Sequence, residues 1–381
     1  MSGVGSRIGP QSTATRASAG RDTYWDHVRL LAMALVVIGH SIEKLDESDS
    51  MYALYLFIYA FHMPLFALVC GVFAKAEPIT RRQGGTILTR LLVPYVVFSV
   101  IWSVVVWWVE GDFLLDLGSP YWHLWFLFAL AVWRLALPVL AALRFPVTAA
   151  VVVGVVSGFM PSIGTRFDMS RTLGMLPFFV LGWAVQQRGG WRAVRTASAR
   201  WPVRVGAALV LLAFAGGCMR WVDAARDGKL RAWFQLERNY ADLGFGGWVP
   251  GLERLALTAL SVLLCLAVLV LVRSTSDLVA PSSSDRLARW GEATMYVYLL
   301  HVFPIYALRQ TEWFGSWFDS VPRFALLVAG AVALTAALST RPVTTAFRPL
   351  VEPPWAGRLL RPDLSGRPLR SAQEGQQRAE P

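Results

Sequence analysis

The sequence has little charge and little cysteine, and both shortages narrow what the protein can be. Only 16% of its 381 residues are charged and 55% are hydrophobic, whereas about a quarter of a typical soluble protein is charged. The three Cys residues show no metal-ligand spacing, and no His pair stands four residues apart. We therefore expect no metal site. The sequence also lacks a Walker A motif, a Gly-rich dinucleotide pattern and a Gly-x-Ser-x-Gly elbow.

The sequence is rich instead in long apolar segments, and its mean hydropathy is +0.47. Scanning for runs of membrane-spanning length gives about ten candidates. They lie near residues 28–45, 52–74, 89–109, 122–143, 147–161, 172–187, 203–221, 253–273, 290–309 and 322–340. We predict an all-α polytopic membrane helical bundle at 22–341. Polar tails at 1–21 and 342–381 are expected to be disordered.

Charge predicts the orientation of this bundle. An even number of spans places both termini on one side. With that side cytoplasmic, the arginine-rich segment 188–204 is inside and the acidic segment 110–116 is outside. The net charge of +11 then reflects topology and attraction to anionic membrane lipid. No soluble basic domain is visible, so we expect no nucleic-acid partner.

The first span carries ionisable residues into the membrane, which is costly and typical of functional sites. At about 100° per residue, His40 returns to within about 20° of Arg29, and Asp26 lies within about 40° of it. These three residues therefore share one helix stripe, with His40 about 16 Å deeper than Arg29. A buried neutral imidazole at that depth is suited to general-base chemistry.

Three further histidines fall in the middle or outer half of the predicted bilayer. His62 precedes a proline and either satisfies a freed backbone carbonyl or has a function. His123 stands in Tyr-Trp-His-Leu-Trp, which favours an interfacial anchor. His301 is as compatible with a satisfied core histidine as with a substrate contact. We place His62, His301 and Trp125 in the acceptor-binding site.

Arg90 begins the third apolar segment, close to Arg81 and Arg82. Arginines at a membrane face can hold a phosphate-bearing ligand through paired hydrogen bonds. On spacing alone, an ordinary basic flank at the cytoplasmic face is the better explanation of these arginines.

Six motifs in order resemble the membrane acyltransferase-3 family, over about residues 22–340. They are Asp26-x-x-Arg29 with Val36–His40, Phe61–Phe66 with Gly71–Phe73, Arg90–Tyr95, Trp122–Leu127, Pro177–Gly182 and Gly291–His301. Members of this family O-acylate sugars and other extracytoplasmic acceptors.

The resemblance implies that His40 is catalytic, supported by Asp26 and Arg29, and that Arg90 meets the acyl-CoA donor. Many members carry a second arginine three residues earlier, where this chain has Ile87; either Arg81 or Arg82 takes its place, or donor binding differs. We assign Arg82 with Arg90 to donor binding. No permanently bound cofactor is expected, since acyl-CoA, by default acetyl-CoA, is a substrate.

These observations predict a multi-pass protein of a bacterial plasma membrane that transfers an acyl group from cytoplasmic acyl-CoA to a hydroxyl of a carbohydrate or lipid-linked acceptor. Direct transfer and an acyl-enzyme route are both compatible with the sequence. Two rival hypotheses stay open. A transporter or flippase would use the same buried charges to move a solute or lipid-linked glycan. A structural component of an envelope-polymer complex would tolerate the loss of His40, Arg29 and Arg90.

Overall fold

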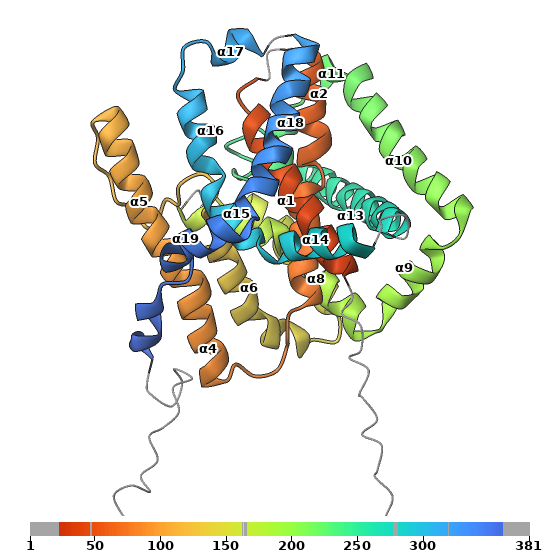
Figure 1. Cartoon of the computed structure of the whole chain (residues 1–381). Helices are drawn as coiled ribbons and strands as arrows, with labels where there is room; N and C mark the ends of the chain where they lie inside the picture. Colours follow the sequence, from red (N-terminus) through yellow and green to blue (C-terminus); the bar gives the residue numbers. More distant parts are fainter. Residues whose placement is uncertain are drawn as a thin grey trace, which may run out of the picture.

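The computed structural model describes residues 23–45, 48–161, 163, 166–276, 281–318 and 320–360, and every regular element in these ranges is a helix (Figure 1). The predicted tail at 1–21 and residues 361–381 of the second tail lie outside the described residues. The first half contains α1 (Tyr24–Ile42), α2 (Asp49–Tyr59), α3 (His62–Val72), α4 (Arg81–Ile87), a π-helical turn (Leu88–Leu92), α5 (Val93–Glu110), α6 (Trp125–Ala141), α7 (Pro146–Val156) and α8 (Met169–Gln187).

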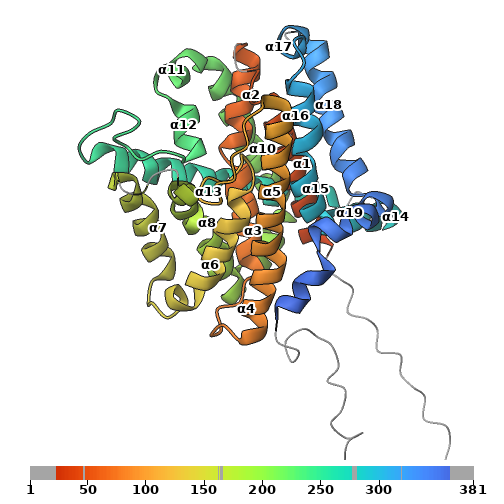
Figure 2. The same cartoon turned by 90° about the vertical axis from the view of Figure 1, so that its left-hand side faces the viewer.

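The second half continues the helical bundle. It contains α9 (Gly190–Ser198), α10 (Trp201–Arg220), α11 (Val222–Asp227), α12 (Leu230–Gln235), α13 (Val249–Ser276), α14 (Pro281–Glu292), α15 (Thr294–Leu300), α16 (Val302–Arg309), α17 (Phe314–Trp317), α18 (Val321–Leu338) and α19 (Arg341–Val351). Helix α1 runs through the middle of the bundle. We call the end where α1 begins the near end, which also holds α4, and the opposite end, with α11 and α17, the far end (Figure 2).

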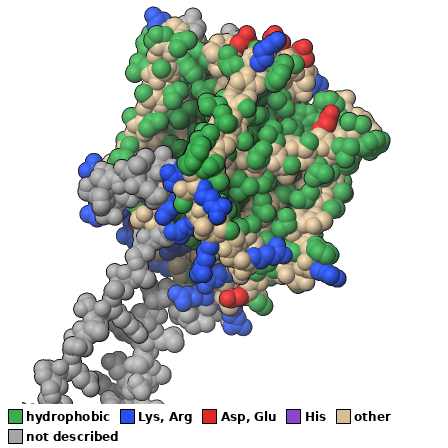
Figure 3. All heavy atoms as spheres, turned by 90° about the vertical axis from the view of Figure 1, so that its right-hand side faces the viewer, with side chains coloured by type: hydrophobic (Ala, Val, Ile, Leu, Met, Phe, Trp, Pro, Cys, Tyr) green, Lys and Arg blue, Asp and Glu red, His purple; other side chains and the backbone are tan. Residues whose placement is uncertain are grey.

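The outside of the bundle is apolar between two charged ends. Figure 3 shows a broad hydrophobic band, with most of the visible Lys and Arg toward the near end and most acidic side chains at the far end. Among the described residues, six helical segments are long and apolar enough to cross a membrane. They are Tyr24–Ile42, Asp49–Val72, Arg81–Glu110, Trp201–Arg220, Val249–Arg273 and Val321–Leu338. The chain is therefore an integral membrane protein of helical class.

The other expected spans are helical but shorter, less apolar or interrupted. Trp125–Ala141 and Pro146–Phe159 are apolar and short, and the segment at 290–309 is divided between α14, α15 and α16. The total of ten spans and the cytoplasmic placement of the termini stay predictions.

Two helix breaks place histidines inside the bundle. α2 and α3 are separated at Ala60 and Phe61, and α15 and α16 are separated at His301. In each case the ring Nδ1 of the histidine donates to the carbonyl four residues earlier. The distance is 2.9 Å from His62 to Ile58 O and 2.8 Å from His301 to Val297 O. The Ile58 carbonyl also accepts the Phe61 backbone N–H, and the Val297 carbonyl accepts the His301 backbone N–H. The ring bonds therefore fix the orientation of the two imidazoles and do not supply a missing backbone partner.

Glycines allow the central helices to touch backbone to backbone. A Cβ on Gly71 would lie 1.9 Å from the Phe179 carbonyl oxygen, and one on Gly182 would lie 2.0 Å from the Leu68 oxygen. Only glycine fits such a contact, so α3 and α8 form a tightly packed pair. This pair supports one wall of both cavities described below.

The prediction of a disordered tail from residue 342 is wrong for residues 342–360. α19 covers Arg341–Val351, and a 3₁₀ segment follows at Pro354–Leu359. Pro342 and Pro354 stand in the first turn of these helices, where a missing backbone N–H costs no hydrogen bond. Val351 is 2% exposed, and the Tyr296 hydroxyl donates to Glu352 at 3.2 Å. The prediction of disorder rested on composition, which does not say whether a proline stands in the first turn of a helix or in its interior.

Candidate active site

A cavity of about 630 Å³ opens among α1, α3, α4, α6, α15 and α19 at the near end; we call it the arginine cavity. Four arginines contribute to its lining, namely Arg29, Arg82, Arg90 and Arg134. Arg82 and Arg90 are exposed, so their guanidinium groups are accessible to a ligand. The sequence predicted both of them for donor binding, and the structure brings both to this cavity.

The other two arginines of this cavity are Arg29 of α1, which the sequence predicted, and Arg134 of α6, which it did not. Arg29 pairs with Asp26 at 3.0 Å and lies over the Phe73 ring, 4.1 Å from its centroid. Asp26 itself is 3% exposed, so it holds Arg29 from behind rather than facing a ligand. Arg134 comes from α6 and was missed in the sequence, because its span looked like uninterrupted apolar helix. Ile87 is 7% exposed and offers no charge.

A second, much tighter cavity of about 40 Å³ lies toward the far end; we call it the histidine cavity. It has room for little more than a water molecule. Its lining includes Val36, His40, Glu43, Tyr59, His62, Met63, Trp122, His123, Trp125, Arg171, Met175, Phe234, Gln235 and Tyr298. The predicted residues His40, His62 and Trp125 therefore meet at one place, although they come from three separate helical segments.

His40 stands between two rings. The His301 ring stacks on it at 5.1 Å between centroids with an interplanar angle of 10°, and the Trp122 ring lies 5.0 Å away on a tilted plane. His40 Nδ1 and His301 Nε2 are 2.8 Å apart, a hydrogen bond between imidazoles. The expected lone imidazole is thus a pair. His301 is fully buried behind His40 and does not line the cavity, so its predicted substrate contact stays a prediction.

The hydrogen bonds determine which ring nitrogens carry protons. The carbonyl of Val297 can only accept, so the proton of His301 is on Nδ1. In a neutral His301 the Nε2 atom is then an acceptor, and His40 must donate to it from Nδ1. The Nε2 atom of His40 is consequently unprotonated. This chain of bonds leaves one basic nitrogen on a residue that lines the histidine cavity.

Charged neighbours fix the end of α1 around His40. Glu43 accepts from the Trp122 indole at 2.9 Å and from Arg309 at 3.3 Å. Arg309 also donates to the His40 backbone carbonyl and lies 4.2 Å over the Trp122 ring. Glu43, Trp122 and Arg309 carried no sequence signal for this role. They come together only because α16 and the entry to α6 pack against the last turn of α1.

His123 is not the interfacial anchor that its aromatic surroundings suggested. It is 1% exposed, packs edge-on against His301 at 5.8 Å, and lines the histidine cavity. Both of its ring nitrogens are buried without a hydrogen-bond partner among the described residues. Buried polar groups without partners are rare, and they concentrate at functional sites. The flanking tryptophans misled the sequence interpretation, since Trp122 and Trp125 also face inward.

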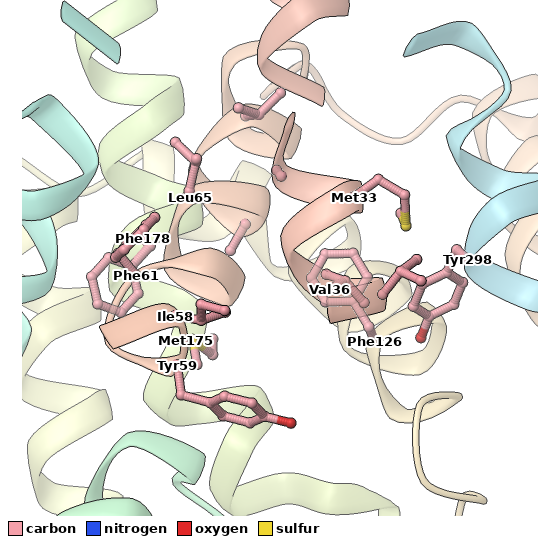
Figure 4. Close-up of a cluster of buried hydrophobic side chains, with 14 of the residues drawn as sticks. Met33, Val36, Ile58, Tyr59, Phe61, Leu65, Phe126, Met175, Phe178 and Tyr298 are labelled. Carbon is pink, nitrogen blue, oxygen red and sulfur yellow. The ribbon is translucent and has the colours of Figure 1, made fainter. Parts of the chain in front are cut away.

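Tyr298 separates the two cavities, because it contributes to the lining of both. Figure 4 shows Tyr298 and Phe126 grouped beside Val36 and Met33, with Tyr59 and Met175 across the cluster. The Tyr298 hydroxyl donates to the His123 carbonyl. Among the described residues, Tyr298 is the one side chain that the two linings share. A molecule that reaches from one cavity to the other must displace this side chain.

The segment at 220–252 closes the histidine cavity. Sequence alone left open whether this segment folds over a cavity or lies on the membrane interface. Phe234 and Gln235 of α12 line the cavity, Gln235 Nε2 donates to the Tyr55 hydroxyl at 2.9 Å, and Arg171 Nε donates to the Gln235 carbonyl at 3.0 Å. Arg171 also pairs with Glu237. The segment is therefore a cover held by polar contacts.

Comparison with known proteins agrees with this architecture. The acyltransferase-3 model, described as an acyltransferase domain, matches residues 22–340. The chain belongs to this family. A curated relative, nodulation protein NolL of Mesorhizobium japonicum (strain LMG 29417 / CECT 9101 / MAFF 303099), is 24% identical over 206 residues, which are 45% of this chain. The alignment spans 50% of that relative. No solved structure matches the chain significantly.

Membership of the acyltransferase-3 family confirms the resemblance deduced from the six motifs, and the matched region is an acyltransferase domain. All six motifs fall within the matched residues, and five of them, all but Pro177–Gly182, contribute side chains to the two cavities. The specific roles of His40, Asp26, Arg29, Arg82, Arg90, His62, His301 and Trp125 stay predictions.

Proposed function

We propose that this protein is a membrane O-acyltransferase that uses His40 to activate an acceptor hydroxyl toward acyl-CoA. The donor enters from the near end, which we take as cytoplasmic, and the acceptor comes from the far end. Acetyl-CoA is the default donor, and a hydroxyl of a carbohydrate or lipid-linked glycan is the default acceptor. The proposal places the protein in a bacterial plasma membrane.

The arginine cavity supports the donor half of this proposal. A CoA thioester combines phosphates with a long uncharged arm, and the cavity combines exposed arginines with apolar walls. Arg82 and Arg90 can form charge-assisted hydrogen bonds with phosphate oxygens. Arg29, restrained by Asp26 and Phe73, lies on the same helix as His40, about 16 Å earlier along its axis. The arm would follow α1 past Tyr298 and bring the thioester to the histidine cavity.

The histidine pair supports the chemical step. The acceptor hydroxyl gives its proton to His40 Nε2 while its oxygen attacks the acyl carbonyl carbon. His301 stays neutral and accepts the hydrogen bond from His40 Nδ1, which fixes the His40 tautomer as the aspartate of a hydrolase triad does, although His301 has no negative charge and supports the imidazolium through this hydrogen bond alone. When the carbon–sulfur bond breaks, the proton on His40 Nε2 passes to the departing sulfur. The products are the acylated acceptor and free CoA, and both histidines return to their starting state.

His123 supplies the remaining group that this reaction needs. As the hydroxyl attacks, negative charge develops on the carbonyl oxygen, and a fixed donor there stabilises the transition state. A neutral imidazole always has one N–H, and that of His123 has no partner among the described residues. We assign His123 to this oxygen. His62 and Trp125, on other walls of the cavity, would contact the acceptor.

The observation that carries the proposal is the bond between His40 Nδ1 and His301 Nε2, because it leaves an unprotonated nitrogen on a residue that lines a small cavity. The cavity's small volume is consistent with a site that opens only when substrate displaces the cover. A transporter would instead need a path through which the solute itself passes.

The test uses inverted membrane vesicles given acetyl-CoA labelled in the acetyl group. We expect the label in wild-type vesicles to become covalently attached to an envelope glycan or glycolipid, which mass spectrometry identifies. Vesicles with His40→Ala should show no such labelling. Label that accumulates inside vesicles as unmodified solute would contradict it and favour a transporter. Equal covalent labelling by both proteins would remove His40 from the mechanism.

A further inference from the structure

A cavity of about 450 Å³ lies next to the histidine cavity at the far end; we call it the vestibule. It is lined by α11, α12 and the segment that follows, together with Tyr52 of α2. Four basic residues contribute to its wall, namely Arg226, Lys229, Arg231 and Arg238, against two acidic ones, Glu237 and Asp242. Cations are expected to be scarce in short outer segments of a membrane protein. Topology therefore gives no reason for this concentration.

The two acids are already engaged elsewhere. Glu237 pairs with Arg171. The Asp242 carboxylate accepts from the Asn239 side-chain amide at 2.7 Å, and the Asp242 backbone N–H donates to Asn239 Oδ1 at 2.9 Å. Glu237 is thus balanced by Arg171, which is not part of the vestibule lining, and Asp242 can offset at most one of the four cations.

Two of the four cations have no carboxylate partner among the described residues. Lys229 donates to the neutral carbonyl of Leu243 at 2.8 Å and lies near the Phe245 ring. Arg238 is exposed, and no ion pair connects it to a described acid. Arg226 and Arg231 have acidic neighbours, Asp49 at 3.4 Å and Glu43 at 3.9 Å. The wall therefore carries an excess of positive charge around an open space, which attracts an anion.

The vestibule is connected to the proposed reaction centre by shared residues. Gln235 lines both cavities. Arg231 reaches from the vestibule to Glu43, which lines the histidine cavity. A ligand anchored in the vestibule would thus extend toward His40. Tyr52, which is buried under the Arg226 guanidinium at 4.2 Å, holds that cation at the vestibule wall.

We propose that the vestibule binds an oxyanion of the acceptor, a carboxylate or phosphate on a saccharide, and thereby selects acidic glycans. This inference rests on the proposed O-acyltransferase function and adds the class of acceptor. The anion is held by Lys229 and Arg238, which frees a neighbouring sugar hydroxyl to enter the histidine cavity.

The test measures saccharide binding to the purified protein in zwitterionic nanodiscs, without any donor. The probes are methyl glucoside, methyl glucuronoside and methyl glucoside 6-phosphate, which differ in charge on one carbon. We expect the two anionic probes to bind at least about tenfold more tightly than the neutral one, as charge-assisted hydrogen bonds predict. The Lys229→Gln/Arg238→Gln double variant should lose this preference. Arg323→Gln, an exposed arginine outside the vestibule, is the matched control and should keep it.

Three results would overturn the inference. They are equal binding of charged and neutral probes by the wild type, an unchanged preference in the double variant, and displacement of methyl glucuronoside when phosphatidylglycerol is added to the nanodiscs. The last result would assign the vestibule to a lipid headgroup. Acetyl-CoA binding to the same samples reports that the double variant is folded. Loss of acyl transfer with intact anion preference would count against the proposed function, not against this inference.

Discussion

The two main cavities of this protein are built on opposite principles. The arginine cavity is roomy, and charged side chains on its wall stay accessible. The histidine cavity is tight, and its polar groups are fixed by one another through ring stacking and hydrogen bonds. The arginine cavity is suited to binding a charged and flexible molecule. The histidine cavity is suited to holding a reacting atom in a single geometry, which is what efficient proton transfer requires.

The difference also shows how a membrane protein can keep the two tasks apart. A charge at membrane depth is costly, and Arg82 and Arg90 stand exposed near the end of the bundle, whereas the charged residues of the histidine cavity, Glu43 and Arg171, are held in ion pairs. Imidazoles carry no charge in their neutral form and can stay deep. Tyr298 and Phe126 stand between the two environments. Removing residues on each side of this partition should therefore affect different kinetic constants.

The largest effect is expected from His40→Ala. Without the base, the turnover number should fall by about 10²- to 10⁴-fold, while acetyl-CoA binding stays near the wild-type value because the arginine cavity is intact. Both quantities can be measured on protein in nanodiscs. His27→Ala is the matched control: His27 is on the same helix and buried, but lines neither cavity. Comparable losses in the two variants would show that α1 packing, not proton transfer, was disturbed.

Gly182→Ala should damage both regions together. The new methyl group would lie 2.0 Å from the Leu68 carbonyl oxygen, so α3 and α8 must separate, at a cost of about 1–3 kcal/mol in unfolding free energy. Thermal unfolding in detergent measures this loss. Gly206→Ala, where nothing lies within 4 Å, is the control and should be neutral. A stable Gly182→Ala protein would contradict the backbone contact.

His301→Phe should separate positioning from binding. His40 would lose its acceptor at Nδ1 and could adopt the wrong tautomer, so the turnover number should fall about 10- to 100-fold, as for a lost charge-assisted hydrogen bond. The Michaelis constant for acetyl-CoA should not change. His301→Gln, whose amide oxygen can accept the same bond, should recover part of the rate. A change confined to the Michaelis constant would instead make His301 a binding residue.

Arg90→Ala is expected to have the smallest effect, and to change the Michaelis constant for acetyl-CoA instead of the turnover number. The Michaelis constant for acetyl-CoA should rise about tenfold with little change in turnover, because one phosphate contact is lost. Arg90→Lys should be intermediate, since an ammonium group cannot form the paired bonds of a guanidinium. Arg144→Ala, an exposed arginine outside the arginine cavity, serves as control. An unchanged Michaelis constant for Arg90→Ala would leave Arg90 a topological residue.

The sequence was informative where local chemistry decides the outcome. The stripe of Asp26, Arg29 and His40 follows from helical periodicity alone, and in the structure Asp26 and Arg29 of that stripe form an ion pair. Apolar runs likewise indicated helices throughout. Family membership was recognisable because six short motifs stand in order, although each one is weak by itself.

Long-range partners could not be predicted in this way. His40 and His301 are 261 positions apart, and nothing in either segment announces that the two rings stack. Glu43 and Arg309 are likewise brought together by the packing of α16 on α1. His123 was misinterpreted because a Trp-rich segment is typical of the membrane interface, while its burial depends on α5, α15 and α16 closing around it. Such contacts are set by tertiary packing, which periodicity does not describe.

The most direct test of the account is an experimental structure with a bound acetyl-CoA analogue that has a non-hydrolysable thioether in place of the thioester. We expect its phosphates at Arg82 and Arg90, its arm along α1 past a displaced Tyr298, and its acyl group in the histidine cavity. The position of an attacking hydroxyl should then lie within about 3.5 Å of both the acyl carbon and His40 Nε2. An analogue that stays among the arginines with Tyr298 in place, or that enters from the far end, would contradict the mechanism.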